Sequence, residues 1–180
     1  LGFNLKSYAF NKNKKLNKKK INKKIDFKII TAFKKNIENS YKYYDAIKEG
    51  VFITRDLVSE PPNVLTPKVY TNEINKLSKL GLKVKIYNEN ELKKLGLNAL
   101  LGVGQGSANE TYLATIEWNG NKQSKGKPLA FVGKGVCFDT GGISLKPARF
   151  MEEMKYDMAG SAVVVGLLKL LALRKAKTNV

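Results

Sequence analysis

Histidine is absent from the 180-residue chain, and cysteine and tryptophan occur only once each. Without histidine, the sequence cannot form Ser–His or Cys–His nucleophiles, Cys/His zinc fingers or the usual imidazole metal sites. The single Cys137 excludes an internal disulfide framework and makes a reducing compartment the default expectation. Any chemistry in this chain must therefore come from carboxylates, lysines and backbone groups.

Long apolar runs are also missing. The longest, residues 160–173, is interrupted by Lys169 and falls short of the roughly 20 residues that a membrane-spanning helix needs. The first residues lack the pattern of a secretory signal. Hydrophobic residues make up 43% of the chain and charged residues 27%, which is typical of a globular protein of about one domain. We therefore expect a cytoplasmic location and no membrane association.

Arginine is scarce, although the formal net charge is +18. Residues 1–35 supply most of that charge, because they contain 12 lysines and a single carboxylate, Asp26. Such a charge allows a Lys-rich nucleic-acid-binding module as an alternative function. Arginine, however, is the preferred residue for bidentate contacts to phosphates and bases. We interpret the Lys/Asn-rich residues 11–24 as an exposed, solvated loop and do not expect nucleic acid as a partner.

The hydrophobic pattern alternates between helical and strand periods, which predicts an α/β fold with a central mixed sheet flanked by helices. From Thr31 the apolar residues recur every three or four positions, which predicts an amphipathic helix that the prolines of residues 59–67 end. Thr66 and Pro67 then predict the start of a second helix. Further expected elements are helices at 88–96 and 157–176, strands at 1–10, 82–87, 112–120 and 128–133, and a turn at 102–106.

The stretch VGKGVCFDTGGISLKP, residues 132–147, follows the expected buried strand 128–133. Ligand sites in open α/β sheets gather at the carboxyl ends of strands, and glycines on both sides of Lys134 permit close approach. Asp139, Lys146 and Asp157 complete a set of four ionisable residues.

The four residues have two possible uses. One is a structural ion-pair network. The other is a metal site, in which carboxylate oxygens act as hard ligands and a lysine joins only as the neutral amine. A second lysine could stay charged and stabilise a developing oxyanion. The residue types alone leave both interpretations open.

Two glycine-rich stretches do not match nucleotide-binding motifs. Residues 133–135 fail the P-loop pattern, and residues 102–106 lack the dinucleotide fingerprint. Cys137 has no histidine partner, so we interpret it as a small buried residue.

The segment 132–147, followed by MEEMKYDMAGSA, resembles the metal-binding core of the leucyl, or cytosol, aminopeptidase family, whose members are two-metal exopeptidases. Residues 55–67 resemble the opening of that family's catalytic domain, and residues 101–107 resemble a glycine turn within it. Residues 7–14 resemble the end of the family's N-terminal domain. The resemblance implies three segments: the tail of the N-terminal domain and a Lys/Asn-rich loop at 1–30, a connecting helix at 31–58, and the first, incomplete part of a zinc-peptidase-like catalytic domain at 59–180.

The resemblance also implies roles for single residues. Lys134, Asp139 and Asp157 match metal ligands, and Lys146 matches the catalytic lysine that polarises the scissile carbonyl. Met154 matches a methionine that lines the pocket for the substrate's first side chain. The implied cofactors are two divalent metal ions, Mn²⁺ or Zn²⁺. The implied substrates are peptides with a leucine-type N-terminal residue, and the implied assembly is a homohexamer.

The family carries a second motif with further carboxylate ligands and an arginine, and no carboxylate follows Asp157 in this chain. Residues 178–180 also read as the first residues of another strand. We therefore expect a piece of a longer metalloprotease that acts in intracellular protein turnover and is inactive as this chain alone. A truncated, non-catalytic remnant of such an enzyme is the alternative.

Overall fold

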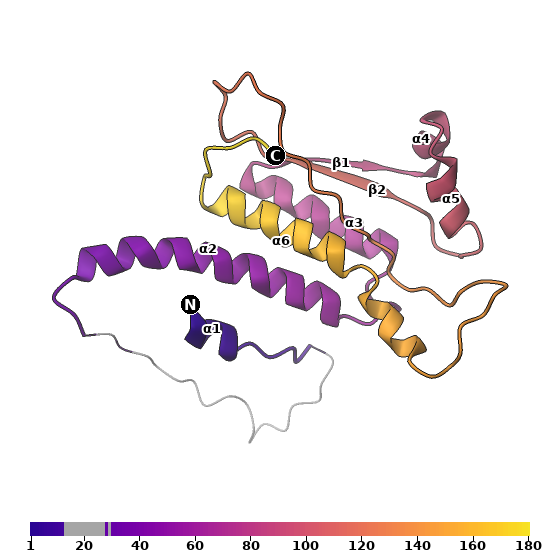
Figure 1. The fold of residues 1–180 in the computed structure, drawn as a ribbon, viewed down its shortest axis with the longest axis horizontal. Coiled ribbons are helices and arrows are strands. Elements are labelled where there is room, and N and C mark those ends of the chain that lie inside the picture. The colour runs from indigo at the N-terminus through magenta and orange to yellow at the C-terminus, as the bar shows by residue number, and fades with distance from the viewer. Residues whose placement is uncertain (13–27, 29) are drawn as a thin grey trace.

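The computed structural model describes residues 1–12, 28 and 30–180, and places long helices beside a small sheet (Figure 1). Its elements are α1 (Gly2–Lys6), α2 (Lys34–Ser59), α3 (Pro67–Asn75), the 3₁₀ helix η2 (Lys76–Leu80), β1 (Lys83–Tyr87), α4 (Glu89–Lys94), α5 (Asn98–Gly104), β2 (Leu113–Glu117), the 3₁₀ helix η3 (Met151–Tyr156) and α6 (Ala159–Leu173). The expected α/β class is confirmed, and the sheet within the described residues consists of two antiparallel strands. Most of the expected Lys/Asn-rich loop lies outside the described residues.

Local sequence signals set several element ends. The Thr66 side chain accepts a backbone N–H bond of 3.4 Å at the start of α3, and Pro67 occupies the first turn. Asn88 and Glu91 form a capping box at the start of α4. Gly81 ends η2 with a φ of 84°, which glycine adopts without steric cost. The helices expected at these positions are confirmed.

The helices α2 and α6 share the most extensive contact between elements, and they lie side by side in Figure 1. Two glycines let their backbones touch. A Cβ on Gly50 would lie 2.7 Å from the Gly166 carbonyl oxygen, and a Cβ on Gly166 would lie 2.5 Å from the Gly50 carbonyl oxygen. Close by, the Thr54 hydroxyl lies 3.0 Å from the Ala162 carbonyl oxygen, to which it can donate. Any side chain at either glycine would force the helices apart.

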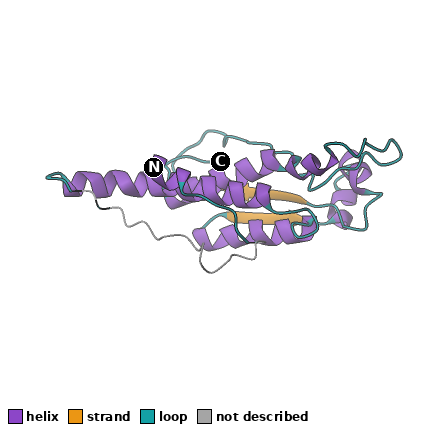
Figure 2. Cartoon of the chain, turned by 90° about the horizontal axis from the view of Figure 1, so that it is seen from below, coloured by secondary structure: helices purple, strands orange, loops and turns teal. Residues whose placement is uncertain are grey.

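The core lies between these helices, α3 and one face of the sheet. Its buried members include Tyr70 and Ile74 of α3 and Val165 and Leu168 of α6. Partly buried side chains of β1 and β2 pack against them. Figure 2 shows the two strands running alongside the long helices. The sheet therefore covers the helices on one side of the core.

The stretch Met151–Leu173, which spans η3 and α6, is 23 residues long and contains an 18-residue window with a mean hydropathy of 1.6. By length and composition it could cross a membrane, so the expectation that no stretch approaches that length does not hold. This criterion gives weak support, because core helices meet it as well, and α6 contributes Ala162, Val165 and Leu168 to the core.

The strands pair in a fixed register, with Lys83 opposite Glu117 and a salt bridge of 3.2 Å between their side chains. Beyond β2, Trp118 and Val180 exchange two backbone hydrogen bonds of 2.8 and 2.9 Å. The C-terminal residues 178–180 thus continue the antiparallel pairing, in agreement with their strand-like sequence.

The expected strand at residues 1–10 is wrong, because Gly2–Lys6 form the short helix α1. The Leu5 and Ser7 N–H groups donate to carbonyl groups four residues earlier, at 3.0 Å each. Backbone groups must find partners, and here the local ones within the segment satisfy them. The turn expected at 102–106 is also partly wrong, since α5 extends to Gly104 before the chain turns.

The buried strand expected at 128–133 is wrong as well. In the described part of the chain, the only backbone hydrogen bond of this segment runs from Leu129 N–H to the Asn179 oxygen, at 3.1 Å. Leu129 is 62% exposed and Val132 is 97% exposed. A strand forms only where neighbouring strands accept its hydrogen bonds and cover its faces, and this segment has only that one backbone hydrogen bond within the described residues.

Candidate metal and catalytic site

The loop that carries Lys134 is seated on the first turn of α6. A Cβ on Gly133 would lie 2.5 Å from the Cα of Ser161, so only glycine fits there. The Lys134 carbonyl accepts the Ser161 N–H at 2.9 Å. A Cβ on Gly135 would meet the Ser161 side chain at ordinary contact distance, with the hydroxyl at 3.4 Å and the Cβ at 3.6 Å. The first of the two glycines is therefore required by contact with the helix.

A tight turn brings Lys146 back to Asp139. Gly141 and Gly142 have φ angles of 94° and 72°, in the left-handed region that favours glycine. The Asp139 carboxylate accepts the Gly141 N–H at 2.8 Å, and the Lys146 N–H donates to the Thr140 oxygen at 2.9 Å. The turn thus closes on itself and fixes both charged residues.

The four ionisable residues form two ion pairs. The Lys146 ammonium lies 2.7 Å from an Asp139 oxygen, and the Lys134 ammonium lies 3.3 Å from an Asp157 oxygen. Lys146 also lies 2.9 Å from the Met154 sulfur. Lys146, a backbone N–H bond and, less strongly, the charge of Lys134 hold the pKa of Asp139 below its ordinary value. Within each pair, the structure brings together residues that the sequence singled out, and the pKa of Asp139 also responds to Lys134 of the other pair.

These side chains are open to solvent to different degrees, from 24% for Asp157 to 59% for Lys134. Two carboxylates and an amine are acceptable donors to a divalent cation. Among the described residues, however, no group of three or more Asp, Glu, Cys or His side chains gathers to hold a metal ion. The donors thus fit part of a metal site, and here each carboxylate has a lysine as its cationic partner.

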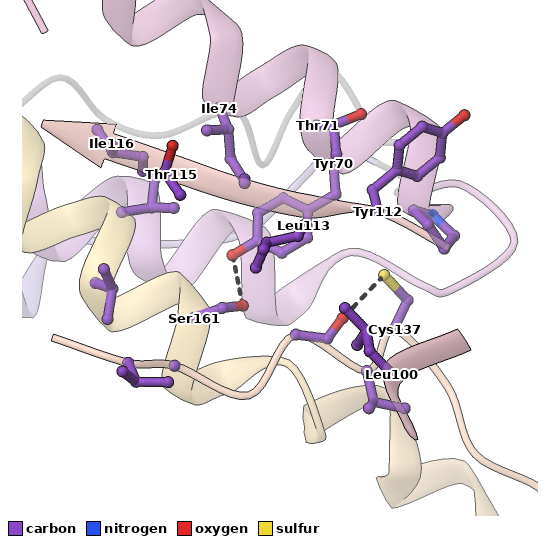
Figure 3. A pocket seen from close by; sticks show the side chains of 18 of the residues that line it. Tyr70, Thr71, Ile74, Leu100, Tyr112, Leu113, Thr115, Ile116, Cys137 and Ser161 are labelled. Carbon is purple, nitrogen blue, oxygen red and sulfur yellow. Dashed lines mark hydrogen bonds between the residues drawn. The ribbon is translucent and has the colours of Figure 1, made fainter. Parts of the chain in front are cut away.

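A cavity of about 670 Å³ lies beside the same loop, between α3, β2 and α6 (Figure 3). Its lining is mostly apolar and includes Ile74, Leu113, Ile116 and Cys137, whereas the two ion pairs do not line it. Burial raises the pKa of the Cys137 thiol to about 11, and the interpretation of Cys137 as a buried residue is confirmed. The charged side chains therefore lie outside this cavity, although Gly133 and Gly135 on both sides of Lys134 line it.

Two hydroxyl groups connect this cavity to the first turn of α6, on which the Lys134 loop packs. The Tyr70 and Ser161 hydroxyl oxygens lie 2.9 Å apart (Figure 3). The Ser161 hydroxyl also donates to the Met158 oxygen at 2.8 Å. A serine has one hydroxyl hydrogen, so Tyr70 must be the donor to Ser161. Sequence reasoning missed both residues, and the only available signal was a serine at the start of an otherwise apolar helix.

The comparison with protein families is decisive for residues 52–180, which match the model described as "Cytosol aminopeptidase family, catalytic domain". The chain belongs to the cytosol aminopeptidase family. A "Probable cytosol aminopeptidase" of Agrobacterium fabrum is 52% identical over 183 residues, which cover 100% of this chain and 37% of that relative. A namesake from Phytoplasma mali is 47% identical, with the same coverage. The chain thus spans little more than a third of the length of these relatives.

Solved structures agree with this membership of the cytosol aminopeptidase family. The "Bottromycin maturation enzyme BotP" superposes with a TM-score of 0.74 at 29% identity, over 94% of this chain and 34% of that one. Its complex with Mn gives a TM-score of 0.63 at 32% identity, over 79% and 30%. The cytosol aminopeptidase of Coxiella burnetii gives 0.71 at 26% identity, over 79% and 30%. The chain shares its fold with enzymes of this family.

The matched region of the cytosol aminopeptidase family begins within α2. It includes residues 52–59 of that helix, with Gly50 just outside it, and every element that follows. The whole charged cluster and its seat on α6 therefore fall inside the catalytic-domain match.

Proposed function

We propose that this chain carries the first part of the active site of a metal-dependent aminopeptidase that removes N-terminal residues, of the leucine type, from peptides. The observation that carries the proposal is the two ion pairs, Lys134–Asp157 and Lys146–Asp139, in which the loop that packs on α6 supplies every residue except Asp157. Membership of the family supports peptide hydrolysis, and the complex of BotP with Mn supports a divalent metal.

The same proposal covers the organisation of the longer protein. Residues 1–30 would end an N-terminal domain, 31–58 would connect, and 59–180 would open the catalytic domain. The relatives are named cytosol aminopeptidases, which supports a cytoplasmic location. A homohexamer is proposed for the intact enzyme only.

Each residue has a distinct task in the proposed reaction. Lys134, Asp139 and Asp157 would hold two divalent ions, Mn²⁺ or Zn²⁺, which supply Lewis acidity and lower the pKa of water at such sites. Lys134 would have to lose its proton to ligate, whereas Asp139 is already favoured as the anion. Lys146 would stay charged and donate to the oxyanion that develops on the scissile carbonyl. Met154, in contact with Lys146, would line the pocket for the first side chain.

The number of carboxylates favours an inactive chain when it is tested alone. Asp139 and Asp157 carry two negative charges against the four positive charges of two divalent ions. We expect purified residues 1–180 to bind Mn²⁺ or Zn²⁺ weakly, at one site, and not to hydrolyse leucine amide above a metal-only blank. Titration calorimetry and an amide-hydrolysis assay measure both quantities. Two tightly bound ions, or turnover, would show that the chain holds a complete site.

The role of Lys146 is best tested in a complete enzyme. The matched third of the Agrobacterium fabrum relative can be replaced by this chain, which aligns along its whole length. Lys146→Ala in that chimaera should retain metal but lower kcat about 10²–10³-fold, the usual effect of one lost oxyanion donor. Asp139→Ala should lose metal and activity together.

The control for this test is Lys155→Ala, another lysine, which lies on η3. It should leave kcat unchanged. Unchanged turnover in Lys146→Ala, with an active parent chimaera, would remove Lys146 from the mechanism.

A further inference from the structure

We propose that Ser161 and Tyr70 are positioning residues for Lys134, an inference that rests on the proposed function. Ser161 makes a hydrogen bond on each side of the Lys134–Asp157 ion pair. Its N–H donates to the carbonyl of Lys134 itself, at 2.9 Å. Its hydroxyl donates to the carbonyl of Met158, which follows Asp157, at 2.8 Å. One residue thus ties together the two backbone segments from which the Lys134–Asp157 pair projects.

Tyr70 fixes Ser161 in turn. Tyr70 belongs to α3, is only 4% exposed, and donates its hydroxyl to Ser161 at 2.9 Å. Ser161 and α3 are therefore held at one separation by a bond inside the core, where loss of a hydrogen-bond partner is costly. Burial raises the pKa of Tyr70 to about 12, so this donor keeps its proton at any physiological pH.

The packing around Ser161 allows little displacement. The missing side chain of Gly133 leaves room for the Ser161 backbone, and a Cβ on Gly160 would lie 3.3 Å from the Lys134 nitrogen. A shift of the first turn of α6 would therefore displace the backbone of Lys134 as well. In metal sites, residues that orient the ligands typically account for about 10–100-fold of metal affinity. We assign this ligand-orienting role to the hydrogen bonds that link Tyr70 to Ser161 and Ser161 to Lys134.

The test is Tyr70→Phe in the full chain, with Thr71→Val as its matched control. Thr71 is also buried, on the same helix, but its hydroxyl donates to the Lys68 oxygen and does not reach Ser161. The first readout is hydrogen exchange of the Ser161 amide, measured by NMR. Tyr70→Phe should speed this exchange about fivefold, the equivalent of one net hydrogen bond, and Thr71→Val should not.

The second readout is Mn²⁺ affinity, followed by the electron paramagnetic resonance signal of the free ion. Tyr70→Phe should weaken binding about 10-fold or more relative to Thr71→Val, when both variants are compared at equal folded fraction. Equal effects of the two variants on exchange and affinity would reduce Tyr70 to an ordinary core residue and overturn the inference.

The two readouts separate this inference from the proposed function. If the unmodified chain binds no Mn²⁺, the metal site fails, and amide exchange alone decides whether Tyr70 and Ser161 hold the Lys134 segment. If Mn²⁺ binds but its affinity and the exchange rate are the same in Tyr70→Phe, the site stands and the positioning role fails. Ser161→Ala, which removes the shared hydroxyl, should reproduce the Tyr70→Phe result in both measurements.

Discussion

The α2–α6 pair and the site loop, residues 128–150, belong to one chain but are held in different ways. The helices complete their own hydrogen bonds and meet through Gly50 and Gly166, with Leu168 only 2% exposed. The site loop exposes Val132 and Leu145 at 97% and 69%. Its backbone is held by one hydrogen bond from α6, by one to Asn179 and by its own turn. The helices α2 and α6 are stabilised by packing, whereas the site loop depends on a few hydrogen bonds and on the close contact of Gly133 with α6.

The largest contrast is expected from removing one leucine on each side. Leu168→Ala in α6 empties a buried position and should lower the free energy of unfolding by about 2–5 kcal/mol. Leu129→Ala in the site loop, where the side chain is 62% exposed, should change it by no more than about 0.5 kcal/mol. Urea unfolding followed by circular dichroism measures both. Similar losses would mean that the site loop is packed as well as the helices.

A smaller effect is expected at the crossing of the helices. Gly50→Ala places a Cβ 2.7 Å from a backbone oxygen of α6 and should cost about 1–3 kcal/mol of stability, as overpacking does. Gly102 of α5 has nothing within 4 Å of its would-be Cβ. Gly102→Ala should therefore stabilise the chain by about 0.5–1 kcal/mol through helix propensity. An unchanged or raised melting temperature in Gly50→Ala would contradict the close approach of α2 and α6.

The sequence was sufficient where structure depends on local chemistry. The cap at Thr66 and Pro67 and the box at Asn88 and Glu91 satisfy helix ends with residues a few positions away, so they can be recognised without the fold. Residues 128–133 have the composition of a buried strand, but a strand depends on distant neighbours, and the segment has one backbone bond.

The candidate site divides in the same way. Asp139 and Lys146 stand close in the sequence, on both sides of two glycines, and a local turn at those glycines brings the two side chains to 2.7 Å. The part of Ser161 and Tyr70 could not be foreseen, because these residues are 91 positions apart and only packing of α3 on α6 makes them neighbours.

The smallest expected effect concerns acid titration in the two regions. Lys169 holds the pKa of Glu49 below its ordinary value between the helices, and Lys146 does the same for Asp139 in the site loop. A lowered pKa means that the folded state favours the anion. This contribution to stability is present above the unfolded-state values of about 4.3 for Glu and 3.9 for Asp, and it is lost as the pH falls through the folded values.

Carboxyl NMR titration tests this assignment. Lys169→Ala should raise the pKa of Glu49 and leave that of Asp139 unchanged, and Lys146→Ala should do the reverse. If either substitution moved both pKa values, the two regions would be electrostatically coupled and the comparison would need revision.

Cys137 gives this chain an internal reporter of its own opening. Thiolate is the species that alkylating reagents attack, and burial raises the pKa of this thiol from 9.0 to about 11. At neutral pH the folded chain thus presents about 100-fold less thiolate than the unfolded chain, before shielding by the core is counted. Because the chain has no second cysteine, the rate of labelling by iodoacetamide reports the opening that exposes Cys137, in the segment between Gly135 and Asp139.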